Sequence, residues 1–306
     1  MSKILIFGHK NPDTDTICSS LVMEKYCKNI GIDAEAVRLG NLNKETKYVF
    51  EFLGIEPQRM IEEVEDGQEV ILVDHNEFAQ SAKNIEKAEI TRVVDHHRIC
   101  DFVTAGPLYY TAEPVGCTST VLFKMFKQSN IEIERNEAIL MLSAIVSDTL
   151  LFKSPTCTNE DKKAAEELAE IANINIEEYG LEMLKAGTDL SDLSAKELIC
   201  LDAKEVMLKD VKAEIAQVNT ASIPDMMQRK NEIEEEMQKE IAEKGLDLFM
   251  LAITDIINSN SQAVVLGNKA ELVEKSYNVK LENNSAFLPG VVSRKKQIIP
   301  ILTENA

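Results

Sequence analysis

The histidines of this chain are concentrated in three short segments, each of which also contains aspartate. His9 lies in GHKNPDTD, His75 in DHN, and His96 and His97 in DHH, and no other histidine occurs in the 306 residues. Each segment follows or ends an apolar run typical of a buried strand, namely KILIFG, EVILVD and ITRVVD. Imidazole and carboxylate together suit divalent transition metals, and open α/β sheets bind ligands beyond the carboxyl ends of their strands. The pattern therefore predicts a metal site at one edge of a parallel sheet.

The aspartates near these histidines also have ordinary structural explanations. Asp13 and Asp15 are two residues apart and point the same way in an extended turn, but either could instead cap the following helix. Asp74 could start a turn as well as bridge two ions. Asp148 lies in the apolar segment MLSAIVSDTLLF, where an unpaired carboxylate is costly. We therefore favour a metal partner for Asp148 over a role as an N-cap.

The number of candidate ligands indicates more than one ion. Adjacent side chains at a strand end diverge, so one of His96 and His97 can bind metal while the other faces a substrate. Four aspartates with two or three histidines are too many ligands for one tetrahedral zinc. They fit two ions with shared carboxylates, which could turn a water into hydroxide and clamp both oxygens of an in-line phosphoryl displacement.

A group of cations near the C-terminus could bind an anionic substrate. Arg294, Lys295 and Lys296 are consecutive and follow the segment LPGVVS. Arg could act as a planar fork and Lys as a point charge on phosphate, or the three could form a solubilising patch before a strand. The spacing does not separate these alternatives. Lys204, in LDAKEV, is a further candidate cation.

Length, charge and cysteine content limit the class of protein. The length suggests about two domains. With 33 basic and 52 acidic residues the net charge is −19, which argues against nucleic acid or an anionic membrane as partner. The start resembles no secretory signal, and the longest apolar stretch, Ile139 to Phe152, is too short to span a bilayer. The six cysteines form no CxxC pair, so we expect reduced thiols in a cytoplasmic protein.

The order of predicted elements indicates an α/β fold. Strands at Lys3–Gly8, Ala34–Leu39, Glu69–Asp74 and Ile90–Asp95 alternate with amphipathic helices, which predicts a parallel sheet with helices on both faces. The polar, turn-rich segment GTDLSDLS then separates this part from a smaller mixed α+β domain. We expect domains over residues 1–187 and 195–306, joined by a linker over 188–194. In the second domain we expect one helix from Ile223 to Lys244 and a last strand at Gln297–Ile301.

Several longer segments carry a resemblance to a known family. They run from GHKNPDTDTICS, ILVDHNE and VVDHHRI through PLYYTAEPVGCTST and LSAIVSDTLLFKSPTCT to LDAKE and GVVSRKKQ. The chain resembles the family II inorganic pyrophosphatases, a branch of the DHH phosphoesterase superfamily, over essentially its whole length. DHH alone would indicate only the superfamily. The C-terminal SRKKQ, without a glycine-rich GGGH-like segment, favours the pyrophosphatase branch.

The resemblance implies a role for each candidate residue. One ion would be held by His9, Asp13, Asp74 and Asp148. The second would be held by Asp15, Asp74, His96 and Asp148, so that Asp74 and Asp148 bridge. His97 would face the substrate as an electrophile or proton donor. The phosphates would be bound by His97, Lys204, Arg294 and Lys295. His75 matches the family pattern, and we expect it to support the ligands without binding an ion.

The resemblance also implies a reaction and its partners. We expect hydrolysis of pyrophosphate to two phosphates by a bridging hydroxide, with His97, Asp74 and Asp148 as the catalytic residues. Two Mn²⁺ ions per subunit are implied, with Co²⁺ or Mg²⁺ as substitutes, and a homodimer formed through the N-terminal domain. No regulatory insert separates His97 from Asp148.

Two other functions remain as alternatives. Another DHH-type phosphoesterase would act on nucleotide, oligonucleotide or polyphosphate substrates, and aromatic platforms would then stack the bases. The chain has no Trp and only 5% aromatic residues, which counts against base stacking. A non-catalytic metal or nucleotide sensor would have lost a ligand or the cations, and neither loss is seen.

Overall fold

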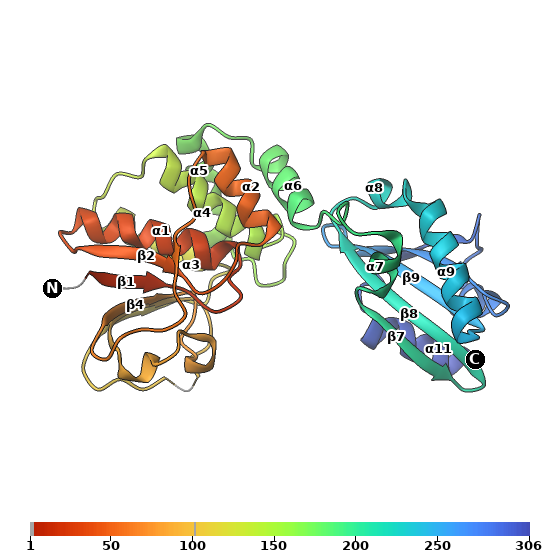
Figure 1. Ribbon diagram of the computed structural model, residues 1–306. Helices are drawn as coiled ribbons and strands as arrows, with labels where there is room; N and C mark the ends of the chain where they lie inside the picture. Colours follow the sequence, from red (N-terminus) through yellow and green to blue (C-terminus); the bar gives the residue numbers. More distant parts are fainter. Residues whose placement is uncertain (1–2, 101) are drawn as a thin grey trace. The chain divides into compact units, whose positions relative to one another are not determined.

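A computed structural model describes residues 3–100 and 102–306, and the chain divides into two compact units (Figure 1). Unit 1 ends at Gly187 and unit 2 begins at Thr188. None of the helices in the described ranges is both long and apolar enough to cross a lipid bilayer. The predicted α/β class is confirmed, with a parallel sheet in unit 1 and a smaller mixed sheet in unit 2.

Unit 1 is built on a six-stranded sheet in which every neighbouring pair is parallel. The order is β3-β2-β1-β4-β5-β6. Successive strands are added on one side of β1 as far as β3, and on its other side from β4 onward. Open α/β sheets bind their ligands beside such a change in strand order. The strands are β1 (Ile4–Phe7), β2 (Ala34–Arg38), β3 (Arg59–Met60), β4 (Glu69–Val73), β5 (Glu89–Asp95) and β6 (Tyr109–Ala112).

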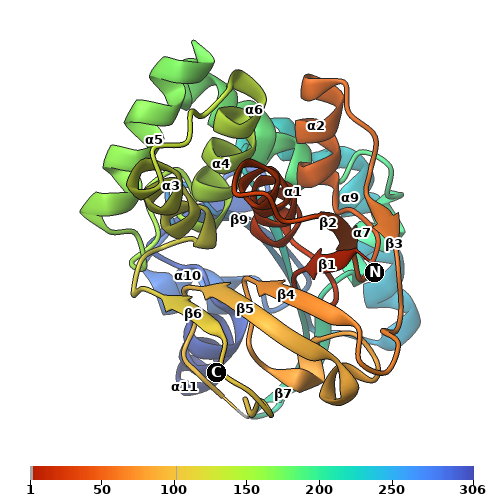
Figure 2. The same cartoon turned by 90° about the vertical axis from the view of Figure 1, so that its left-hand side faces the viewer.

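The two faces of this sheet are covered differently. The α-helices lie together on one face (Figure 2), where strand residues such as Ile6, Ile71 and Val94 join the main core. They are α1 (Thr14–Asn29), α2 (Lys44–Leu53), α3 (Thr118–Gln128), α4 (Arg135–Asp148), α5 (Asn159–Ala172) and α6 (Ile176–Gly187). The other face packs against a segment with two short 3-10 helices, η1 (Phe78–Gln80) and η2 (Ile85–Lys87). Burial on both faces explains why the central strands are continuous apolar runs.

Unit 2 has a five-stranded mixed sheet in the order β11-β10-β9-β8-β7. Only the β8–β9 pair is parallel among the described strands of this sheet. The strands are β7 (Ala203–Leu208), β8 (Val211–Thr220), β9 (Leu248–Asp255), β10 (Asn260–Leu266) and β11 (Ser285–Pro289). One face packs against α7 (Ala195–Cys200), α8 (Ile223–Met227) and α9 (Lys230–Lys244), and the other against α10 (Glu271–Tyr277) and α11 (Ile299–Asn305).

Two expected elements of unit 2 are wrong. The segment Gln297–Ile301 is helical, because a π-helical turn over Arg294–Ile298 leads directly into α11. Ile298 and Leu302, four residues apart, are both buried in one core, and a short apolar run of this kind does not distinguish strand from helix. The single helix expected from Ile223 to Lys244 is divided into α8 and α9.

Candidate metal centre

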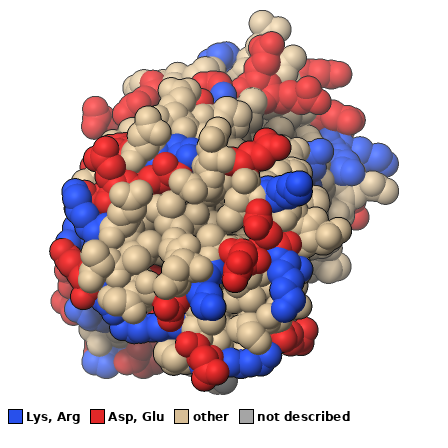
Figure 3. All heavy atoms as spheres, turned by 90° about the vertical axis from the view of Figure 1, so that its right-hand side faces the viewer, with Lys and Arg blue, Asp and Glu red and all other residues tan. Residues whose placement is uncertain are grey.

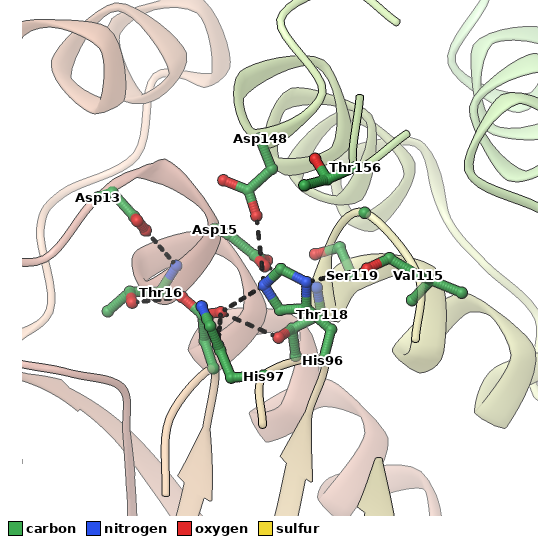
Figure 4. Close-up of polar contacts among 12 residues, drawn as sticks. Asp13, Asp15, Thr16, His96, His97, Val115, Thr118, Ser119, Asp148 and Thr156 are labelled. Atoms are coloured by element: carbon green, nitrogen blue, oxygen red, sulfur yellow. Dashed lines mark hydrogen bonds and ion pairs between the residues drawn. The ribbon is translucent and has the colours of Figure 1, made fainter. Parts of the chain in front are cut away.

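The predicted ligands lie where three neighbouring strands of unit 1 end. His9 follows β1, Asp74 follows β4, and His96 follows β5. The other three ligands come from helix ends: Asp13 is the N-cap of α1, Asp15 lies in its first turn, and Asp148 is the last residue of α4. Figure 4 shows Asp148 and His96 pointing toward one another from a helix and a strand end. The sheet topology therefore brings residues from distant parts of the chain to one edge.

Asp74 lies at the centre of this arrangement. Only 1% of the surface of Asp74 is accessible to solvent. One carboxylate oxygen, Oδ2, is 3.5 Å from Nε2 of His9, and the other, Oδ1, is 3.3 Å from Nε2 of His96. Each oxygen thus faces a different imidazole, as a carboxylate that bridges two ions would.

The ligand atoms form three overlapping groups that share Asp74. The first group contains His9, Asp13 and Asp74, the second contains Asp15, Asp74, His96 and Asp148, and the third contains Asp74, His96 and His97. Within each group, one ligand atom from every residue lies within 4.8 Å of the others. The structure thus brings together all six expected metal ligands. Asp148 joins the second group, whereas the resemblance also placed it in the first.

Hydrogen bonds fix the orientation of the imidazoles of His9 and His96. Nδ1 of His9 is 2.8 Å from the carbonyl oxygen of Lys10, and Nδ1 of His96 is 3.1 Å from that of Val115. Because a carbonyl oxygen can only accept, each Nδ1 donates a proton, and Nε2 faces the carboxylates. A backbone carbonyl behind a histidine is the usual support of a metal-bound ring. Nitrogen and carboxylate donors of this kind fit divalent ions such as Mn²⁺.

Burial and the concentration of negative charge shift the pKa values of the histidines and aspartates at the site. Burial lowers the pKa of His9, but the contacts with Asp13 and Asp74 outweigh it and raise that pKa to about 9. Burial also lowers the pKa of His96, but the contacts with Asp74 and Asp15 outweigh it and raise that pKa to about 9. Burial, with Asp15 adding to it, raises the pKa of Asp74 to about 7. Burial and then Asp15 and Asp74 hold the pKa of Asp148 well above its usual range. Carboxylates so close together disfavour one another's ionisation unless cations lie between them.

Hydroxyl and amide groups that sequence reasoning did not identify support the carboxylates. Oγ1 of Thr16 donates to Asp74 at 2.7 Å, and Oγ1 of Thr118 donates to it at 3.1 Å. The backbone amide of Thr118, at the start of α3, donates to Asp15 at 2.7 Å. The only signal in the sequence is the position of Thr in TDT and GCTST, at the beginnings of helices. Asp13 is the N-cap of α1, since its Oδ1 accepts from the amide of Thr16, and its Oδ2 lies 3.3 Å from Nε2 of His9, so the cap leaves one oxygen facing the candidate site.

His97 lines a hollow of about 420 Å³ beside these carboxylates. Its side chain is 51% exposed, and its Nδ1 lies 2.9 Å from Oδ1 of Asp95. The Asp95 side chain is fully buried and also accepts from the amides of His96 and His97. Asp95, to which the sequence assigned no role, therefore fixes the turn that carries both histidines.

The expected phosphate-binding cations lie in unit 2. Lys204 is exposed on β7, and Lys295 is exposed in the π-helical turn. Within the described ranges neither forms an ion pair. Arg294, in contrast, is 2.7 Å from the carboxylate of Asp202, and its guanidinium also contacts the carbonyl oxygen of Ile215, the residue paired with Lys204. Figure 3 shows acidic and basic side chains interspersed over the face that it draws.

Comparisons with known proteins agree with this geometry. Residues 3–145 match the family model of the DHH family N-terminal domain, and residues 181–305 match that of the DHHA2 domain. The chain is 58% identical to a probable manganese-dependent inorganic pyrophosphatase of an Exiguobacterium species, over 100% of this chain and 99% of the relative. It is 57% identical to the manganese-dependent inorganic pyrophosphatase of Bacillus subtilis, over 99% of both.

Solved structures give the same result. A structure from Methanococcus jannaschii assigned to the family II inorganic pyrophosphatases is 40% identical over 98% of both chains, with a TM-score of 0.62. An exopolyphosphatase-related protein from Bacteroides fragilis, 14% identical with a TM-score of 0.51, covers 99% of this chain and 91% of its own and shares the fold. The resemblance seen in the sequence is confirmed: this chain belongs to the family of manganese-dependent, or family II, inorganic pyrophosphatases.

Proposed function

We propose that this chain hydrolyses pyrophosphate to two phosphates at a centre of two metal ions. The observation that carries the proposal is the convergence of six candidate ligands into overlapping groups that share Asp74. The ions would be held by His9, Asp13, Asp15, Asp74, His96 and Asp148. When bound, two divalent ions supply Lewis acidity and an activated water for in-line displacement at phosphorus.

We propose Mn²⁺ for both positions, with Co²⁺ or Mg²⁺ as substitutes. Two imidazole nitrogens among four carboxylates favour a transition ion over Mg²⁺, which prefers oxygen ligands alone. The names of the full-length relatives, which specify manganese, support this choice.

The chain's own residues would bind and orient the substrate. His97, held by Asp95 and half exposed at the hollow, can donate to a phosphate oxygen or to the leaving phosphate. Lys204, Arg294 and Lys295 would neutralise the remaining phosphate charge. Asp74 and Asp148 would act in catalysis as ligands of the ions.

The hollow favours pyrophosphate over a nucleotide. Of the described residues, those that line it include no Phe, Tyr or Trp, so it offers no aromatic surface for a base. The test compares pyrophosphate, a dinucleotide and a nucleotide bisphosphate in the presence of Mn²⁺. We expect rapid release of phosphate from pyrophosphate alone, whereas cleavage of the dinucleotide with inert pyrophosphate would support the alternative phosphoesterase.

Proton release should accompany metal binding. With pKa values of about 9, His9 and His96 are mostly protonated at pH 7.5 without metal, and both must lose a proton to bind an ion. Addition of Mn²⁺ should therefore release at least about two protons per chain, because Asp148, whose pKa is also raised, must lose any proton it carries, and the affinity should rise with pH up to about 9. A pH-stat titration measures the release. Binding without proton release, and with an affinity that does not change between pH 6 and pH 9, would contradict the prediction.

We also propose a homodimer formed through unit 1. β6 is an edge strand, and Tyr109 on it is 70% exposed while the nearby Val103 is 78% exposed. An exposed edge strand of this kind readily pairs with another chain. Light scattering should give twice the chain mass of 34.2 kDa. Tyr109→Glu should shift the protein to monomers, and Met60→Glu on the opposite edge strand should not. A monomeric wild type would contradict the proposal.

We propose a cytoplasmic location as well. The structure forms no disulfide among the described cysteines, which is the usual state in a reducing compartment. Fractionation of the source cells tests this location. Recovery of the protein outside the cytoplasmic fraction would contradict it.

A further inference from the structure

We propose that His75 is a positioning residue whose Nδ1 proton holds Asp74 in the geometry needed to bind metal. The inference rests on the proposed function, because it takes Asp74 to be a ligand. Among the described residues, His75 is the one histidine that belongs neither to a ligand group nor to the lining of the hollow beside His97.

Both nitrogens of His75 are engaged in the interior. The residue is 3% exposed, and its ring centroid lies 6.3 Å from that of the buried Phe7. Nδ1 is 2.9 Å from the carbonyl oxygen of Val73, and Nε2 is 3.0 Å from Oγ of Ser81. Because the carbonyl oxygen can only accept, Nδ1 carries the proton, and Nε2 of the neutral ring accepts from the Ser81 hydroxyl. With both nitrogens used, His75 cannot itself bind an ion.

The bond from His75 to Val73 spans the residue between them, Asp74. Asp74 has a φ of 59°, in the left-handed region that residues other than glycine rarely adopt. Its own amide donates to the carbonyl oxygen of Val94 at 2.9 Å. The His75 ring therefore closes the turn around Asp74, and this turn directs the carboxylate toward the imidazoles of His9 and His96.

The second nitrogen connects the same ring to the loop that carries His9. Ser81 ends η1, and the carbonyl oxygen of Gln80 accepts from the amide of Lys10 at 2.7 Å. The carbonyl oxygen of Lys10 in turn accepts from Nδ1 of His9. His75 thus connects the turns that carry Asp74 and His9. It closes the turn around Asp74 directly, and it reaches His9 through Ser81, Gln80 and Lys10.

Substitutions can separate this role from simple packing. Asn places its amide nitrogen near the position of Nδ1, so His75→Asn retains a donor to Val73 and loses the contact with Ser81. Gln reaches the position of Nε2, so His75→Gln retains the contact with Ser81 and loses the donor to Val73. A residue that only fills space would make the smaller Asn the more disruptive variant, whereas a positioning role through Nδ1 makes Gln the more disruptive variant for metal binding.

The experiment measures Mn²⁺ binding directly, by electron paramagnetic resonance of the free ion, together with the melting temperature in chelator. His75→Asn should bind within about threefold of wild type, and His75→Gln should bind about 10- to 100-fold more weakly, as for other groups that orient metal ligands. Each variant loses one hydrogen bond, but Asn also leaves more empty space, so the metal-free melting temperature of His75→Asn should be the lower of the two. Ser81→Ala, which leaves the ring intact, should bind within about threefold of wild type.

Three results would overturn the inference. These are wild-type affinity in His75→Gln, equal weakening in both His75 variants, and a loss in Ser81→Ala as large as that in His75→Gln. Failure of the wild type itself to bind Mn²⁺ would overturn the proposed metal centre, and this inference with it. A normal wild type with an unaffected His75→Gln would overturn the role of His75 alone.

Discussion

Replacement of Asp148 by Asn is expected to lower Mn²⁺-dependent turnover of pyrophosphate by at least about a thousandfold. Loss of a group that only orients a metal ligand costs about 10- to 100-fold, and Asp148 is proposed as a ligand itself. Its Oδ2 lies 3.7 Å from Nε2 of His96, within the group that also contains Asp15 and Asp74. Asn keeps the shape of the side chain but removes the negative charge. Steady-state phosphate release measures the effect.

The stability of the same variant shows whether the loss is local. Without metal, burial and the charges of Asp15 and Asp74 disfavour the ionised Asp148, so the neutral Asn should leave the melting temperature unchanged or raise it. Added Mn²⁺ should raise the melting temperature of the wild type and have a much smaller effect on the variant. Unaltered metal-dependent turnover in Asp148→Asn would contradict the two-metal account.

Replacement of Lys295 by Ala is expected to lower kcat/KM for pyrophosphate by about 10- to 100-fold, as expected for loss of one charge-assisted contact to phosphate. Lys295 is exposed and has no ion pair in the described parts of the chain, so its ammonium group is available to an anion. Lys296→Ala is the matched control, because it removes the same charge from the next position. We expect that control to stay within about twofold of wild type.

Arg294 is less suitable for this test, because its guanidinium also binds the carboxylate of Asp202. Its removal would disturb the start of β7 as well as any phosphate contact. For Lys295→Ala, an unchanged KM together with an unchanged kcat would contradict the role of this residue in substrate binding.

The convergence of the candidate ligands could be predicted from the sequence because parallel strands end at one edge of a sheet. The apolar runs that become β1, β4 and β5 are recognisable in the sequence, and the residues that follow them must then be neighbours. The edge strands β3, β7 and β11 were not predicted. β3 has two exposed residues and β7 is mostly exposed, so their positions depend on pairing with a neighbour, and their own pattern does not reveal them.

The groups that support the ligands could not be predicted, because they meet only in the folded chain. Thr118 contacts Asp74 across 44 positions of sequence, and the carbonyl oxygen of Val115 has no side-chain signature at all. The role of Asp95 was not predicted for a different reason. It precedes His96 and His97 in the sequence, and the interpretation of that segment assigned roles to the two histidines alone. Residue type thus indicated which groups could bind metal, and tertiary contacts decide how they are held.

The most direct test of the central claim is phosphate release from pyrophosphate by protein stripped of metal with a chelator. The account predicts no measurable release after the chelator is removed, and full recovery when Mn²⁺ is added back. Equal rates with and without metal, or no release in the presence of Mn²⁺, would contradict it.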